Sequence, residues 1–124
     1  MIYNNQYFNK MNLAGFYFDP KHGGCLRRII KKNHTSYKIH GVFGDDESPM
    51  HGYWFAKINT DGKKNEEEYN LSVDFSGKPG KKRINYKAIW NNRKRTIEWD
   101  DGNIWQKLFV HNRQLLNLKV DYKY

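Results

Sequence analysis

The stretch EWDDGNIW, residues 98–105, is the clearest hairpin signal in the chain. Asp-Gly readily adopts the positive φ angles of a tight turn, and apolar residues lie on both sides of it. Apolar and polar residues alternate along 97–108 with a period of two, which is typical of strands. We therefore expect two antiparallel strands joined by this turn. The alternating positions are Ile97 and Trp99 before the turn, and Ile104, Gln106 and Leu108 after it.

The same period of two extends along most of the chain. In 37–43, 71–75 and 84–90, apolar residues occupy every second position. Further strand-like runs cover 13–18, 25–32 and 53–59, and runs rich in Gly, Asp, Asn and Pro separate them. About eight short strands at this spacing predict an all-β antiparallel meander. A closed or partly open barrel is expected, because closure removes exposed sheet edges.

The length of 124 residues predicts one small β domain, 1–124. Its core is expected at 13–109, with an N-terminal extension at 1–12 and a C-terminal extension at 110–124. The ending LLNLKVDYKY, residues 115–124, also alternates and predicts an extra strand, although its first residues could open a short amphipathic helix. The two extensions are the expected contacts of a homodimer.

Composition excludes several classes of protein. Only 38% of residues are hydrophobic, but aromatic residues make up 16% and bury a large area each, which argues against disorder. The single Cys25 excludes an internal disulfide and favours a reducing, intracellular compartment. No signal peptide and no apolar run long enough to cross a membrane is visible.

Positive charge is concentrated in SGKPGKKRINYKAIWNNRKR, residues 76–95, which has no acid in a chain of net charge +9. If 84–90 is a strand, these cations cluster at its two ends, with Lys87 between them. A second acid-free stretch, 21–38, adds further cations, whereas the acids gather in other loops. This segregation favours a surface that binds a polyanion, and solubility alone is the alternative. The predicted binding residues are Lys78, Lys81, Lys82, Arg83, Lys87, Arg93, Lys94, Arg95, Arg27, Arg28, Lys31 and Lys32.

The sequence gives little support for a catalytic site or a metal site. Zinc needs three or four converging ligands, whereas His22 and Cys25 are the only closely spaced pair and His34 and His40 follow on other segments. Adjacent acids on turns point apart, which does not suit a pair of catalytic carboxylates. No phosphate-binding glycine loop is present. We expect no metal, no cofactor and no enzymatic activity.

Four stretches resemble a small, largely uncharacterised β-rich domain of algae, bacteria and giant DNA viruses. They are GFYFDPKHGGCLR (15–27), GVFGDDE (41–47), VDFSGKPG (73–80) and WDDGNIWQKL (99–108). The resemblance covers about residues 13–108 and supports an all-β fold. It implies no established activity. Together with an Asn-, Lys- and Ile-rich composition, it implies a giant-virus member associated with the virion and with the host cytoplasm.

The leading functional prediction is sequence-independent binding of nucleic acid, with duplex DNA as the expected partner, in packaging or compaction of a viral genome. Contacts to phosphates would dominate, since no base-reading motif is present. Exposed aromatic residues could also stack on single-stranded bases. The candidates are Tyr3, Tyr7, Tyr53 and Trp105. The alternative is a barrel that holds an apolar ligand or a protein partner without catalysis.

Overall fold

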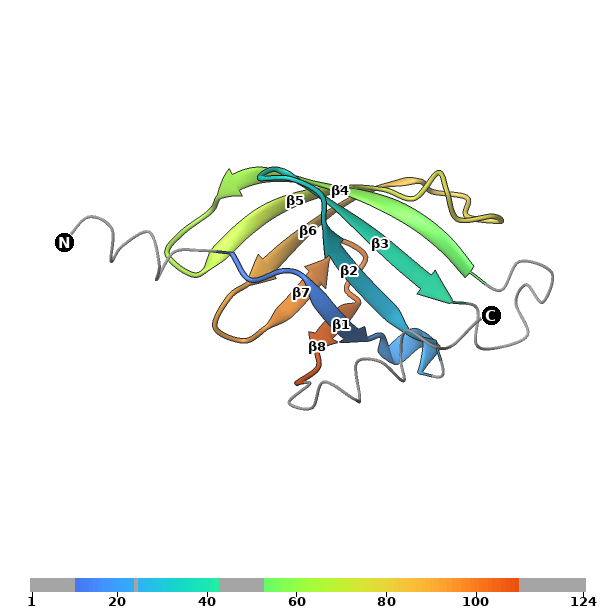
Figure 1. The fold of residues 1–124 in the computed structure, drawn as a ribbon, viewed down its shortest axis with the longest axis horizontal. Coiled ribbons are helices and arrows are strands. Elements are labelled where there is room, and N and C mark those ends of the chain that lie inside the picture. Colours follow the sequence, from blue (N-terminus) through green and yellow to red (C-terminus); the bar gives the residue numbers. More distant parts are fainter. Residues whose placement is uncertain (1–10, 24, 43–52, 110–124) are drawn as a thin grey trace.

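A computed structural model of the chain describes residues 11–23, 25–42 and 53–109. Eight antiparallel strands follow one another in chain order and close into a barrel, in which β8 pairs with β1 (Figure 1). The predicted all-β meander and its closure are confirmed. The strands are β1 (Gly15–Phe18), β2 (Arg27–Lys31), β3 (Ser36–Val42), β4 (Tyr53–Lys63), β5 (Glu68–Asp74), β6 (Asn85–Asn91), β7 (Thr96–Trp99) and β8 (Ile104–Lys107).

A single 3-10 turn, Pro20–His22, interrupts the connection between β1 and β2. Asp19 caps it, because its side chain accepts a hydrogen bond from the Lys21 amide. The predicted C-terminal strand or short helix and the homodimer contacts of the extensions lie outside the described residues.

Alternation along the strands places one set of side chains inside the barrel. All four tryptophans are buried there, together with Tyr17, Ile39 and Leu71. At one end of the barrel, neighbouring rings contact one another from Trp54 through Phe75 and Trp99 to Trp105. Aromatic side chains therefore fill this end of the interior, as expected for a small barrel.

Gly41 is required by the tight packing of β3 against β4. It lies opposite Trp54 in the register, and a Cβ at this position would overlap the Trp54 indole. Any other residue at position 41 would displace that ring, since a packed interior has no space to absorb the added atom.

The register of β8 differs from the sequence prediction. Ile97 is opposite Trp105, so Trp105 shares the inward face of Ile97, and Lys107 follows it inward. Ile104 is 48% exposed, and Gln106 and Leu108 also point outward. The predicted alternation of Ile104, Gln106 and Leu108 is present, but these residues lie on the outward face. The reason is that the loop 100–102 has three residues, which shifts the register by one residue relative to a two-residue turn. Gly102, in this loop, has the expected positive φ of 90°.

Polar groups buried inside the barrel join its first and last strands. Asp19 and Arg27 are 3% and 2% exposed, and 3.4 Å separates the Arg27 Nη2 and Asp19 Oδ2 atoms. Asn103, in the β7–β8 loop, donates to Asp19 Oδ1 at 2.9 Å.

A second buried polar contact lies at the opposite end of the barrel. There, Lys107 Nζ donates to the carbonyl oxygen of Asn12 at 2.8 Å. Burial, with a further contribution from Arg95, lowers the pKa of Lys107 to about 8.

Asp19→Ala should destabilise the barrel strongly, because it removes a buried carboxylate that accepts hydrogen bonds from Arg27 and Asn103. We expect a loss of about 3–5 kcal/mol in the free energy of unfolding, measured by urea denaturation. The control is Glu67→Ala, which removes an exposed carboxylate paired with Arg93 and should cost at most about 1 kcal/mol. Equal losses in the two variants would contradict this role of Asp19.

Candidate nucleic-acid interface

The cations of 76–95 lie at two opposite ends of the barrel. Lys81, Lys82 and Arg83 precede β6, and Arg93, Lys94 and Arg95 follow it, as the sequence predicted. Because β6 runs the length of the barrel wall, these two groups do not form one compact patch (Figure 1). Any polyanion that contacts both groups must extend along the strand.

Several of the predicted binding residues are paired with acids. Arg83 pairs with Asp100, Arg93 Nε lies 2.9 Å from Glu67 Oε2, and Lys87 Nζ lies 3.7 Å from Asp61 Oδ2. The prediction for Arg27 is wrong, because its side chain is buried inside the barrel beside Asp19. The alternation of β2 requires this, since Ile29 also points inward.

Other predicted cations cover aromatic rings. Lys78 Nζ lies 4.8 Å from the centre of the Trp54 ring, and Lys81 Nζ lies 4.6 Å from that of Tyr86. The Arg95 guanidinium lies 4.1 Å from the Phe109 ring centre. In the described part of the chain, no acid pairs with the remaining predicted side chains, and these are therefore available to an external anion. They are Arg28, Lys31, Lys32, Lys82 and Lys94. Of these, Arg28 also lies over a ring, with its guanidinium 5.5 Å from the Phe16 ring centre.

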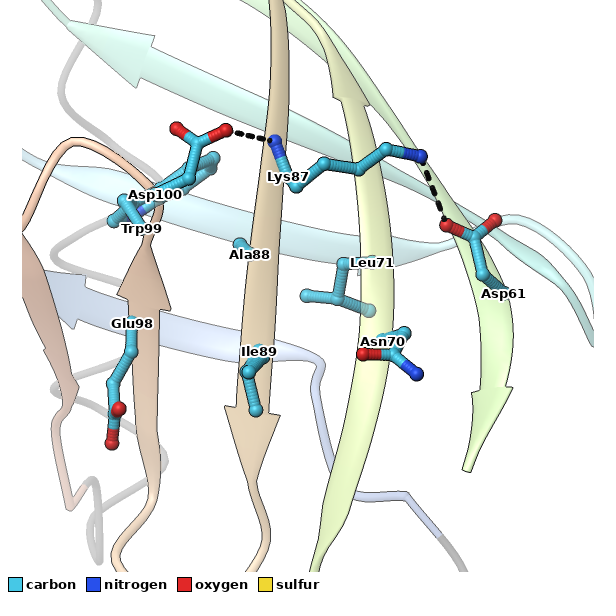
Figure 2. Close-up of a pocket in the computed structure, with 9 residues that line it drawn as sticks. All are labelled: Asp61, Asn70, Leu71, Lys87, Ala88, Ile89, Glu98, Trp99 and Asp100. Carbon is cyan, nitrogen blue, oxygen red and sulfur yellow. Dashed lines mark hydrogen bonds and ion pairs between the residues drawn. The ribbon is translucent and has the colours of Figure 1, made fainter. Parts of the chain in front are cut away.

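The outer wall of β5, β6 and β7 carries acids beside its cations. It carries a pocket of about 540 Å³ whose lining includes Asp61, Glu98 and Asp100. Figure 2 shows the Lys87 side chain reaching across β5 to Asp61, while Asp100 accepts a hydrogen bond from the Lys87 amide. Burial alone would raise the pKa of Asp100, but hydrogen bonds from Lys87 and Arg83 outweigh it and lower that pKa. Acids therefore neutralise Lys87 and Arg83 on this wall, which makes these two cations less available to a polyanion.

The opposite wall, formed by β2, β3 and the first half of β4, has a basic and aromatic outer surface. Neither β2 nor β3 contains an acid. The register aligns Arg28, His40 and Phe55 in one row across the three strands, and Ile30, Lys38 and Lys57 in the next. We call this surface the β2–β4 face and define it by its outward side chains. They are Arg28, Ile30, Lys38, His40, Tyr53, Phe55 and Lys57.

Three rings form a cluster on the β2–β4 face. The His40 and Phe55 rings are stacked with centres 4.8 Å apart and planes inclined by 25°. The Tyr53 ring meets both edge-on, at 5.6 Å from His40 and 5.5 Å from Phe55. Tyr53 is 48% exposed, and Lys38 Nζ lies 3.9 Å from the Phe55 ring centre. Large rings and cations thus lie together on an outer surface.

A groove of about 510 Å³ adjoins this cluster. Its lining includes Lys32, Lys38, Phe55 and Lys57, and Asp74 on β5 is the acid at its border. Asp74 lies opposite Lys57 in the register. The groove therefore carries a positive charge excess along β3 and β4.

The sequence indicated only part of this site. Arg28, Lys31, Lys32 and the exposed Tyr53 were predicted, but Lys38, His40, Phe55 and Lys57 were not assigned to it. Lys38 and His40 alternate with Ile39, which signals an outward position, but their approach to Phe55 depends on the strand register. The proposed stacking role of Trp105 is wrong, because this side chain is 4% exposed. Tyr3 and Tyr7 lie outside the described residues.

The described residues form neither a cluster of metal ligands nor a membrane-spanning helix. Across residues 11–23, 25–42 and 53–109, no three His, Cys, Asp or Glu side chains gather as a metal site would require. No helix among those same residues is long and apolar enough to cross a bilayer. The chain matches no protein-family model, no curated protein and no solved structure. The resemblance to the algal and viral β domain therefore stays a prediction.

His40 should titrate below its ordinary pKa of about 6.5. Burial lowers its pKa, and the nearby charges of Lys38 and Arg28 lower it further. The unfolded chain therefore binds this proton more readily, so the contribution of His40 to stability is complete above about pH 6.5 and is lost as the pH falls. NMR titration of the imidazole protons measures the pKa directly.

In that titration, Lys38→Gln should raise the pKa of His40. The charge-matched control is Lys57→Gln, since Lys57 is on the neighbouring strand, diagonal to His40 and opposite Asp74. It should change the pKa less. An equal change in both variants would mean that His40 senses only the net charge of the protein.

Proposed function

We propose that this protein binds nucleic acid without reading base sequence, through contacts between phosphates and the β2–β4 face. The observation that carries the proposal is the segregation of charge. On the β5–β7 wall, Lys87 and Arg93 are paired with acids. Arg28 and Lys38 lie on a wall whose strands β2 and β3 have no acid, and Lys31 and Lys32 lie at the end of β2. A surface that served solubility alone would need no such separation.

The spacing of these cations suits a chain of phosphates. Arg28, on β2, is one strand away from Lys38, on β3, and Lys57 follows on β4. Neighbouring strands are about 4.8 Å apart, so these three cations, which belong to two adjacent rows, span roughly 10 Å across the strands. Lys32 follows β2 in the β2–β3 turn, and Lys31 is exposed at the rim of the barrel, opposite the buried Tyr37. Several phosphates could be neutralised together, and release of their counterions would supply much of the binding free energy.

A barrel that holds an apolar ligand is the second candidate. Such a ligand needs an interior cavity of about 300 Å³ or more. Contacts between Trp54, Phe75 and Trp99 occupy one end of the barrel, and Trp90 and Tyr17 meet edge-on further inside. This packing favours nucleic acid binding over the second candidate. We further propose that binding involves no catalysis and serves the packaging of a giant-virus genome.

Binding should weaken as salt rises, because phosphate contacts depend on counterion release. We expect the slope of log K against log salt to be about −0.9 for each phosphate contacted on duplex DNA. Replacing Lys31, Lys32 and Lys38 together by Gln should reduce the steepness of that slope by roughly two to three. Fluorescence anisotropy across a salt series, with duplexes of several base sequences, measures both quantities.

The control variant replaces Arg83, Lys87 and Arg93 by Gln. It removes the same number of charges, but from residues that are already paired with acids. It should change affinity much less. Equal weakening by the two variants would show that only net charge matters, and no salt-dependent binding by the natural protein would overturn the proposal.

A further inference from the structure

We infer that the β2–β4 face binds single-stranded nucleic acid, with bases stacked on Tyr53 and on the His40–Phe55 pair. The inference rests on the proposed function and adds the strand type and the mode of contact. Stacking on aromatic side chains is tolerant of sequence, because every base has a flat face. It therefore agrees with binding that does not depend on base sequence.

The exposure of the ring cluster supports this assignment. Single exposed apolar residues are normal on protein surfaces, but three rings in mutual contact form a continuous patch. Tyr53 and Phe55 alternate with the buried Trp54 and Ala56, so the strand points them outward while its other face fills the core. The fold requires residues that favour a β-strand at positions 53 and 55, but it does not require aromatic rings there, because both side chains point outward.

The cations around the rings favour a ligand that carries both bases and phosphates. Arg28 flanks His40 in the same row, and Lys38 and Lys57 lie two residues along the strands from His40 and Phe55. Two residues of a strand span about 7 Å. A surface for a protein partner would have no comparable need to surround its rings with unpaired cations.

Lys38 covers the Phe55 ring and would have to move when a base binds there. At an exposed site this cation–π contact is weak. Stacking of a base contributes more, and the displaced ammonium gains a phosphate. The exchange is therefore favourable. Tyr53, with the largest exposed fraction of the three rings, can stack without this rearrangement.

A duplex does not fit the same contacts. Its bases are already stacked within the helix, and rotating one out breaks stacking and base pairing. The duplex could use only the cations, so the rings would add nothing to its affinity. The strand type is thus decided by whether Tyr53 and Phe55 contribute to binding.

The experiment uses the full chain and four probes of equal length. They are a thymidine strand, a uridine strand, an abasic deoxyribose-phosphate strand and a DNA duplex. About 20 nucleotides exceeds the ~4–16 that one small barrel covers. The variant is Tyr53→Leu with Phe55→Leu, which keeps the apolar, strand-compatible character but removes the rings. The matched control is Phe18→Leu, an exposed ring on β1, 43% exposed and outside the cluster.

The natural protein should bind the thymidine or uridine strand more tightly than the duplex or the abasic strand, and the preferred strand distinguishes DNA from RNA. The double variant should lose roughly ten- to hundred-fold in affinity for strands with bases and almost nothing for the abasic strand. Phe18→Leu should change neither. Urea denaturation verifies that the variants fold.

Other results separate the two proposals. If the natural protein binds all probes equally with a salt-dependent affinity, the stacking inference is overturned and the proposed function stands. If no probe binds, both fail. If the double variant does not fold, NMR of the natural protein tests the inference instead. The His40 and Tyr53 ring protons should shift upfield when the thymidine strand binds, but not when the abasic strand binds. Equal shifts with both strands would overturn the inference.

Discussion

The structure depends on a buried ionic contact at the point where the barrel closes. β1 and β8 share only a short register, in which Tyr17 is opposite Lys107 and Phe18 is opposite Gln106. Asp19 extends this junction, since it accepts hydrogen bonds from Arg27 on β2 and from Asn103 before β8. A buried pair of this kind adds little net stability, but an alternative register would leave one of its charges unpaired. The contact therefore selects one closure of the sheet.

That closure determines which side chains form the β2–β4 face. Because side chains alternate along a strand, placing Arg27 inside requires Arg28 outside, in the row of His40 and Phe55. A slip of one residue in β2 would exchange the two arginines and bury the charge that flanks the rings. The candidate site and the buried ion pair are thus consequences of the same register.

Sequence patterns predicted the strands well because each depends on a few neighbouring residues. The alternation around Ile39, Val73 and Trp90 correctly gives their inward face. Features that depend on distant residues were missed. The loop 100–102 sets the register that places Trp105 inside the barrel, although it was expected outside. The pairing of Arg27 with Asp19 places a cation inside the barrel. The β2–β4 face was only partly found for the same reason. Its rows combine three strands, and nothing local to Phe55 indicates that Lys38 and His40 lie beside it.

Among the described residues, no acid pairs with Arg28 or Lys38 on the β2–β4 face, so their charges oppose folding and call for a function. Burial lowers the pKa of His40, and the charges of Lys38 and Arg28 lower it further, as expected where positive groups lie close together. The chain does provide acids for Lys87 and Arg93 on the other wall. A protein optimised only for stability would distribute them on both walls, and departures from local optimality are expected where a ligand acts. A bound polyanion would relieve this repulsion, so the stability lost in the free protein would be recovered on binding.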